Sequence, residues 1–143
     1  MKRMPKVSEA PLAKDRRSTV HVIEPNEEEL VFLCDFLSMS GFKTSGSSRA
    51  ESALEYVARM KPDVLLCPLL SGGVNVEDVL VRTRKTSPHT QVLLTSPRIH
   101  DPLPEGIRKV TGVDLLRGPH NAVTLLRAVE RLIGRDPEGE SGE

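Results

Sequence analysis

Five short strand-like runs alternate with longer amphipathic stretches along this chain, and this alternation constrains its fold more than any other feature. Four of the runs have the β-branched and aliphatic composition of strands, at residues 19–23, 64–67, 91–95 and 113–116, and residues 42–45 are a weaker strand candidate. The run at 64–67 is continuously apolar, as strands buried on both faces of a parallel sheet are. Because a helix-length segment follows each run, the pattern predicts parallel strands joined by right-handed crossovers.

The segments between the runs carry helix signals. Asn26 precedes three glutamates, which is an N-cap followed by acids that favour the first turn, and Gly41 is placed to end that helix. The next helix is expected to begin at a cap on Ser47 or Ser48, with Glu51 completing a capping box. Further helices are predicted from 76 to 86, over a short segment at 105–110, and from 122 to 133.

The order of these elements predicts an α/β fold: a flavodoxin-like, doubly wound sheet of five parallel strands in the order 2-1-3-4-5, with helices on both faces. This domain is expected to span residues 19–134. Residues 1–18 carry six basic and two acidic side chains, whereas 135–143 carry one basic and four acidic side chains. Neither end has hydrophobic periodicity, so we expect a disordered basic leader and a disordered acidic tail.

Composition argues against several classes of protein. Twenty basic and twenty acidic residues balance, and three Phe, one Tyr and no Trp leave little for base stacking, so no nucleic-acid partner is expected. The apolar runs are too short to span a membrane, and no apolar stretch follows the basic start as in a secretory signal. Two cysteines and four scattered histidines indicate neither a disulfide framework nor a metal site. A cytoplasmic location without a cofactor is therefore expected.

Ligands of such a sheet bind at the carboxyl ends of its strands, near the switch point between the first and third strands. The residues that follow or end the predicted strands therefore form the candidate pocket: Glu24, Pro25, Cys67, Pro68, Thr95, Ser96 and Gly118. Cys67 could be a reactive thiol in this position, although a free cysteine on a strand is usually a small buried apolar residue.

Four short motifs at the predicted strand ends make the chain similar to a known family. They are Lys61-Pro62-Asp63 before the third strand, Thr95-Ser96 after the fourth, Gly112-Val113-Asp114 into the fifth, and Gly118-Pro119 after it. At these spacings the chain resembles the receiver domains of bacterial two-component signalling, over about residues 19–133.

The resemblance implies a pocket from which the family's chemistry is missing. An active receiver accepts a phosphoryl group on its own Asp after the third strand, and two acids after the first strand hold Mg²⁺. A Lys that precedes a Pro after the fifth strand neutralises the phosphoryl group. Here the acids are reduced to Glu24 beside Pro25, the acceptor position falls on Pro68 or Cys67, and the lysine position falls on Gly118. Leu115 stands where an aromatic switch residue is usual. We therefore expect a non-enzymatic pseudo-receiver that is not phosphorylated at an aspartate.

A pseudo-receiver would act by binding signalling proteins. The resemblance implies a partner face formed by the short helix at 105–110, the last strand and the last helix, which could also pair two copies of the chain. The residues expected on it are Arg108, Lys109, Leu115, Arg117, His120, Arg127 and Arg131. Two alternatives stay open: a small-ligand or anion sensor that uses the vacated pocket at Glu24, Pro68, Thr95 and Gly118, and an unusual route of phosphorylation.

Overall fold

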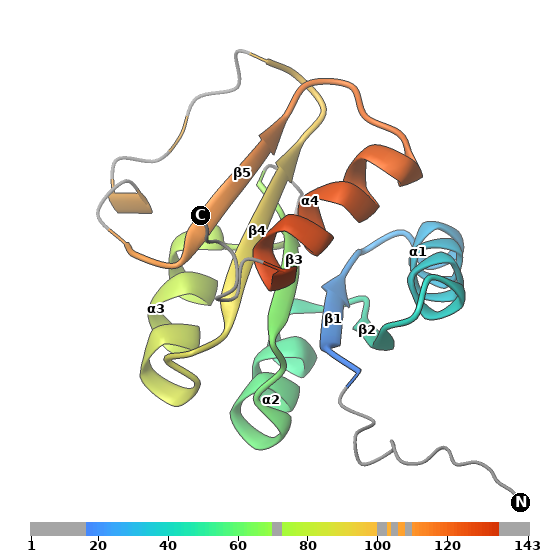
Figure 1. The fold of residues 1–143 in the computed structure, drawn as a ribbon. Coiled ribbons are helices and arrows are strands. Elements are labelled where there is room, and N and C mark those ends of the chain that lie inside the picture. The colour runs from blue at the N-terminus through green and yellow to red at the C-terminus, as the bar shows by residue number, and fades with distance from the viewer. Residues whose placement is uncertain (1–16, 70–72, 100–102, 104–105, 108–109, 135–143) are drawn as a thin grey trace, which may run out of the picture.

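The computed structural model describes residues 17–69, 73–99, 103, 106–107 and 110–134 (Figure 1). The predicted leader and tail lie almost wholly outside these residues. The strands are β1 (Thr19–Ile23), β2 (Lys43–Ser47), β3 (Val64–Pro68), β4 (Gln91–Ser96) and β5 (Val113–Arg117). The helices are α1 (Glu27–Met39), α2 (Ala50–Met60), α3 (Val76–Thr86) and α4 (Ala122–Gly134). All strands are parallel in the order β2-β1-β3-β4-β5, which confirms the predicted fold class.

Two helices cover each face of the sheet (Figure 1). Alternate strand residues point to opposite faces, so β1, β3, β4 and β5 each contribute to two separate cores. On β1, Val20 and Val22 pack with α1 and α4, whereas Ile23 packs with α2 and α3. β3 is buried on both faces from Val64 to Cys67, as its continuous apolar run predicts.

The helix starts follow local hydrogen bonding. Asn26 caps α1 as predicted, because its side-chain oxygen accepts from the Glu29 backbone N–H at 2.9 Å. The predicted serine cap of α2 is wrong: the N-cap is Arg49, and it makes no side-chain capping bond. The reason is tertiary, since Ser47 is the last residue of β2 and its hydroxyl bonds to Nε2 of His21 at 2.8 Å.

The short helix predicted at 105–110 is only partly testable, because three of its residues lie outside the described part of the chain. Gly106 and Ile107 form a 3-10 turn, and the Val110 N–H donates to the Ile107 carbonyl. The described part of the predicted helix is therefore a 3-10 turn. Among the helices of the described chain, none is long and apolar enough to cross a membrane.

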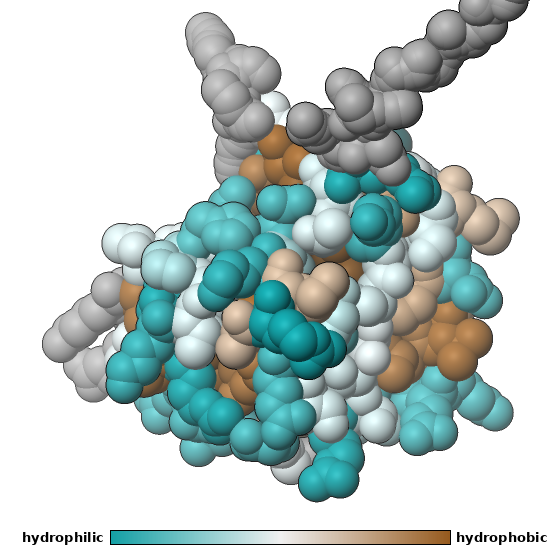
Figure 2. Space-filling model, turned by 90° about the horizontal axis from the view of Figure 1, so that it is seen from below, coloured by the Kyte–Doolittle hydropathy of each residue, from teal (hydrophilic) through white to brown (hydrophobic). Residues whose placement is uncertain are grey.

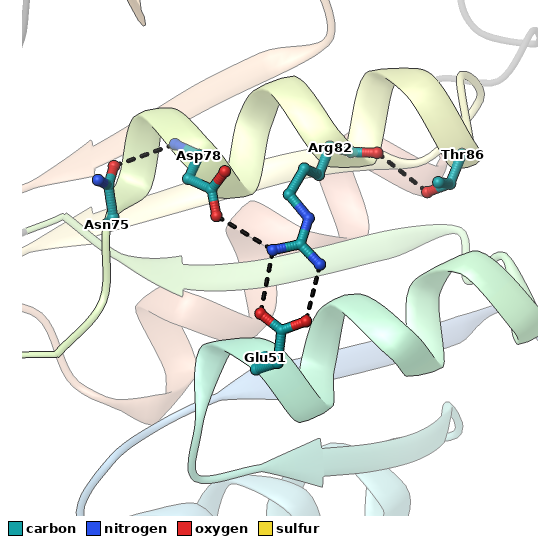
Figure 3. Close-up of polar contacts among 5 residues, drawn as sticks. All are labelled: Glu51, Asn75, Asp78, Arg82 and Thr86. Carbon is teal, nitrogen blue, oxygen red and sulfur yellow. Dashed lines mark hydrogen bonds and ion pairs between the residues drawn. The ribbon is translucent and has the colours of Figure 1, made fainter.

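A charged contact joins the two helices of one face (Figure 3). Arg82 of α3 donates from both terminal nitrogens to the Glu51 carboxylate of α2, at 2.8 and 3.0 Å, and from one of them to Asp78 at 3.3 Å. The hydrogen bond and charge of Arg82 lower the pKa of Glu51. Both groups are exposed, so this network contributes little to the stability of the fold. Its main effect is to hold α2 and α3 in register with each other.

The candidate site lies at only one of the two ends of the sheet. Figure 2 views the end at which the strands begin, and hydrophilic residues cover most of it. Apolar residues gather on the side where α1 lies, and the helix exposes Val31, Phe32 and Met39. The opposite end, where the strands finish, contains the candidate site.

Candidate functional site

A cleft of about 310 Å³ opens at the carboxyl ends of β1, β3 and β4, between α1 and α4. This is where the parallel topology predicts a ligand site. The residues that line it are Val22, Ile23, Glu24, Glu29, Phe32, Leu33, Leu66, Cys67, Pro68, Thr95, His120, Asn121, Ala122 and Leu125. Four predicted pocket residues are therefore brought together, namely Glu24, Cys67, Pro68 and Thr95, whereas Pro25, Ser96 and Gly118 are not part of the lining.

Glu24 provides the carboxylate that follows β1. Its Oε2 accepts from the Asn26 backbone N–H at 2.9 Å, and its own backbone N–H donates to the Ser47 carbonyl at 3.0 Å. The side chain is thus held by its own loop. Pro25 has no carboxylate to offer beside it, so the turn after β1 contributes one acid to the cleft.

The ends of β3 and β4 meet in register, with Pro68 paired to Thr95. The backbone N–H of the next residue, Leu69, donates to the Thr95 carbonyl at 2.8 Å. Cys67 is 1% exposed and belongs to the core against α2 and α3. Burial raises the pKa of its thiol to about 12. The thiol is therefore protonated at neutral pH, and it is a core residue rather than a nucleophile.

The two hydroxyl residues at the end of β4 have different roles. Thr95 is half-buried and lines the cleft. Ser96 is fully buried and closes the following turn, since its Oγ accepts from the Arg98 N–H at 3.4 Å and donates to the Arg98 carbonyl at 3.2 Å. Of the pair, Thr95 is the hydroxyl that a ligand in the cleft can reach.

Gly118 occupies a position that other residues would strain. Its φ is +88°, and a Cβ built there would lie 3.0 Å from Cγ1 of Ile99. The loop after β4 is held in this place in part by Arg117, whose Nη1 donates to the Ile99 carbonyl at 3.4 Å. Backbone geometry and the Ile99 side chain therefore both favour glycine here.

Substituting Gly118 with alanine should destabilise the fold by more than the same change at Gly73. Gly73 has a similar φ of +85° but open space around its would-be Cβ, so both variants incur the left-handed backbone cost of about 1–2 kcal/mol. Only in Gly118→Ala would the new Cβ also crowd the Ile99 side chain. Urea unfolding of the two variants measures the difference, and equal losses would show that the Ile99 contact is unimportant.

Several lining residues escaped the sequence analysis. Glu29 and Phe32 lie three residues apart on α1, so they share a helix face, and that spacing was the available signal. Which face turns toward the sheet ends depends on tertiary packing. His120, expected on the partner face, also lines the cleft, and its Nδ1 lies 3.2 Å from the Gly118 carbonyl oxygen.

The residues predicted for the partner face do not all lie on one face of the sheet. Arg127 and Arg131 are exposed one turn apart on α4, and Arg117 is exposed at the end of β5. Leu115 is half-buried and packs on the sheet face that α2 and α3 cover, opposite the face of α4. Arg108 and Lys109 lie outside the described residues. The exposed arginines among the residues predicted for this face therefore lie on α4 and at the end of β5.

No family model matches this chain, and no curated protein matches it in sequence. Solved structures do match. A CheY-like response regulator receiver domain protein from Methanospirillum hungatei has a TM-score of 0.72 at 16% identity, over 86% of this chain and 99% of that one. This chain has the receiver fold. Chemotaxis protein CheY4 from Vibrio cholerae (TM-score 0.69, 17% identity, 81% and 98% covered) and the response regulator domain of Thermotoga maritima CheB (0.67, 22%, 85% and 100%) agree.

The receiver fold raises the question of Mg²⁺. That ion prefers several oxygen ligands in octahedral geometry. In the described part of the chain, no group of three or more His, Cys, Asp or Glu side chains is arranged to hold a metal ion. At the strand ends Glu24 is followed by Pro25, and Pro68 has no side-chain oxygen. The residues present do not fit the ion.

Proposed function

We propose that this receiver-fold chain accepts no phosphoryl group and acts as a binding module in signal transduction. The observation that carries the proposal is the chemistry of the strand ends. A proline, Pro68, ends β3 opposite Thr95, and Gly118 follows β5. The receiver fold suggests a regulatory role in signalling, and a domain without the acceptor would fulfil it by binding alone.

The missing groups are those that phosphoryl transfer requires. A carboxylate must attack the phosphorus, and positive charge must offset the negative charge on the transferred oxygens. Arg117 is a poor substitute for the lysine, because its guanidinium donates to the Ile99 carbonyl, away from the cleft lining. Cys67 is a poor substitute for the acceptor, because its thiol is buried and protonated.

The partner surface that we propose comprises Arg127 and Arg131 of α4. Two exposed guanidinium groups one turn apart on α4 would favour a partner with an acidic surface. Charges at the rim of an interface mainly set association rate and partner choice. Homodimerisation through this surface is less consistent with its charge, because two copies would oppose like charges.

Reversal of charge at Arg127 and Arg131 tests this surface. The double variant Arg127→Glu, Arg131→Glu should slow association with captured partners several-fold and reduce the dependence of binding on salt. Lys43→Glu is the matched control, since Lys43 is an exposed cation on β2, at the opposite edge of the sheet. Unchanged capture by the double variant, with the control also unchanged, would show that the surface is wrong.

A second candidate function is a small-ligand sensor. The cleft itself favours it, because a cavity of about 310 Å³ remains at the strand ends. A ligand that binds only the folded chain raises its Tm in a saturable way. A thermal-shift titration therefore separates a sensor from a domain that binds proteins alone.

A further inference from the structure

The cleft between α1 and α4 has the dimensions of a small-molecule site. Such sites are usually largely apolar cavities of about 300–1,000 Å³ with a few polar groups that orient the ligand. The floor of this one contains Val22 and Leu66, which are 1% and 3% exposed, and Leu125 of α4 closes it from the side. An apolar ligand of about ten heavy atoms would fit this lining.

Phe32 gives the cleft an apolar surface that the fold leaves partly uncovered. Its side chain remains 51% exposed although it lies beside Leu33 in the lining. Its ring stacks on Phe36 of the next helical turn, with ring centroids 6.1 Å apart, which fixes its orientation. A ligand that covered this ring would remove apolar surface from water and gain free energy from it.

The charge of the lining is acidic. Glu24 and Glu29 contribute carboxylates and His120 an imidazole, and none of the residues that line the cleft is a lysine or an arginine. The helix N-termini nearby are each capped by a side chain. Asn121 caps α4 by accepting from the N–H and the hydroxyl of Thr124, at 2.9 and 3.1 Å, and Asn26 caps α1. The donors that usually attract an anion to a helix start are therefore partly used.

We infer that this cleft binds small apolar amines and discriminates against carboxylates and phosphate. The hydrocarbon part of the ligand lies against Val22, Leu66 and Phe32, and its ammonium group faces Glu24 and Glu29. Charge-assisted hydrogen bonds to those carboxylates supply the selectivity, with the Thr95 hydroxyl as a further polar partner. The inference rests on the second candidate function, ligand sensing at this cleft, and it reverses the preference for phosphate that the fold suggests.

Four matched probes test the inference on the full chain: 3-phenylpropylamine, 3-phenylpropan-1-ol, 3-phenylpropionate and inorganic phosphate. Titrations followed by amide NMR shifts locate the site. The amine should bind saturably, with shifts centred on Val22, Leu66 and Leu125, the alcohol more weakly, and the two anions not measurably. The double variant Glu24→Gln, Glu29→Gln should bind the amine about tenfold more weakly than the unaltered chain and should bind the alcohol with unchanged affinity. Glu130→Gln, an exposed carboxylate on α4 outside the lining, is the control.

The outcomes separate the inference from the function on which it rests. If the carboxylate or phosphate binds as tightly as the amine, ligand sensing stands and the inferred charge preference is wrong. If the double variant keeps the full preference for the amine, Glu24 and Glu29 are not its cause, and the inference is equally overturned. If no probe gives saturable shifts at the cleft, the inference falls, and the thermal-shift titration then decides separately whether the cleft senses another ligand.

Discussion

Acidification from pH 6.5 to pH 4 is expected to lower the free energy of unfolding by about 3 kcal/mol through one residue, His21. Burial lowers the pKa of this imidazole from 6.5 to about 4. Between those values the unfolded chain binds a proton that the folded chain does not. The stabilisation is therefore complete above pH 6.5 and is lost as the pH falls toward 4.

The surroundings of His21 explain why it stays neutral. The side chain is 1% exposed and lies between β2 and α2. Nδ1 and Nε2 lie 2.7 and 2.8 Å from the hydroxyl oxygens of Ser45 and Ser47, and the ring stacks on Tyr56 with centroids 4.2 Å apart. Hydroxyl groups can donate or accept, so they satisfy a neutral ring in either tautomer. A charged ring would lose its hydration without gaining an anionic partner.

Urea unfolding at pH 7.5, 6.0, 5.0 and 4.5 measures the effect, with His21→Gln as the comparison. Glutamine is neutral throughout, so the loss of stability on acidification should be much smaller in this variant. The carboxylates and the other histidines titrate in both proteins and cancel in the difference. Parallel pH profiles for the two proteins would contradict the account of His21.

Truncation of Leu125 to alanine is expected to cost about 2–5 kcal/mol of unfolding free energy. Leu125 is 3% exposed on α4 and packs into the core shared with α1, β1 and β3. Its removal leaves a cavity next to the cleft, which should therefore become larger. The change tests whether α4 is anchored to the sheet by this side chain, because the helix provides one wall of the candidate site.

Val123→Ala is the matched control for Leu125→Ala. Val123 lies two residues earlier on the same helix but is 49% exposed, so its truncation removes little buried surface and should change stability by less than about 0.5 kcal/mol. Denaturant unfolding of both variants gives the comparison. Similar losses at the two positions would mean that α4 does not pack as described.

The fold was accessible from the sequence because its signals are local. Strand runs, Asn26 as a helix cap and Gly41 after the helix each depend on residues a few positions apart, and parallel topology follows from their order. The failed prediction was a serine cap for α2. Ser47 has the right residue type, but His21, twenty-six positions away, engages its hydroxyl. Such a tertiary contact overrides local propensity and cannot be read from spacing.

The candidate site could be predicted from the sequence only in part. Glu24, Pro68 and Thr95 could be grouped because parallel strands end at one edge of the sheet. Gly118 was predicted to stand at the position of the family's lysine, which stays a prediction. Its positive φ and the approach of Ile99 depend on how the loop after β4 folds back. Phe32 was not among the residues grouped at the strand ends, although it lines the cleft. Its place in the cleft depends on how α1 packs on the sheet.

Intact mass after incubation with a small phosphodonor and Mg²⁺ tests the central claim most directly, which is that these strand ends accept no phosphoryl group. An active receiver treated in parallel serves as the positive control. We expect the mass of this chain to stay unchanged while the control gains one phosphoryl group. A stoichiometric gain of one phosphoryl group on this chain would contradict the account.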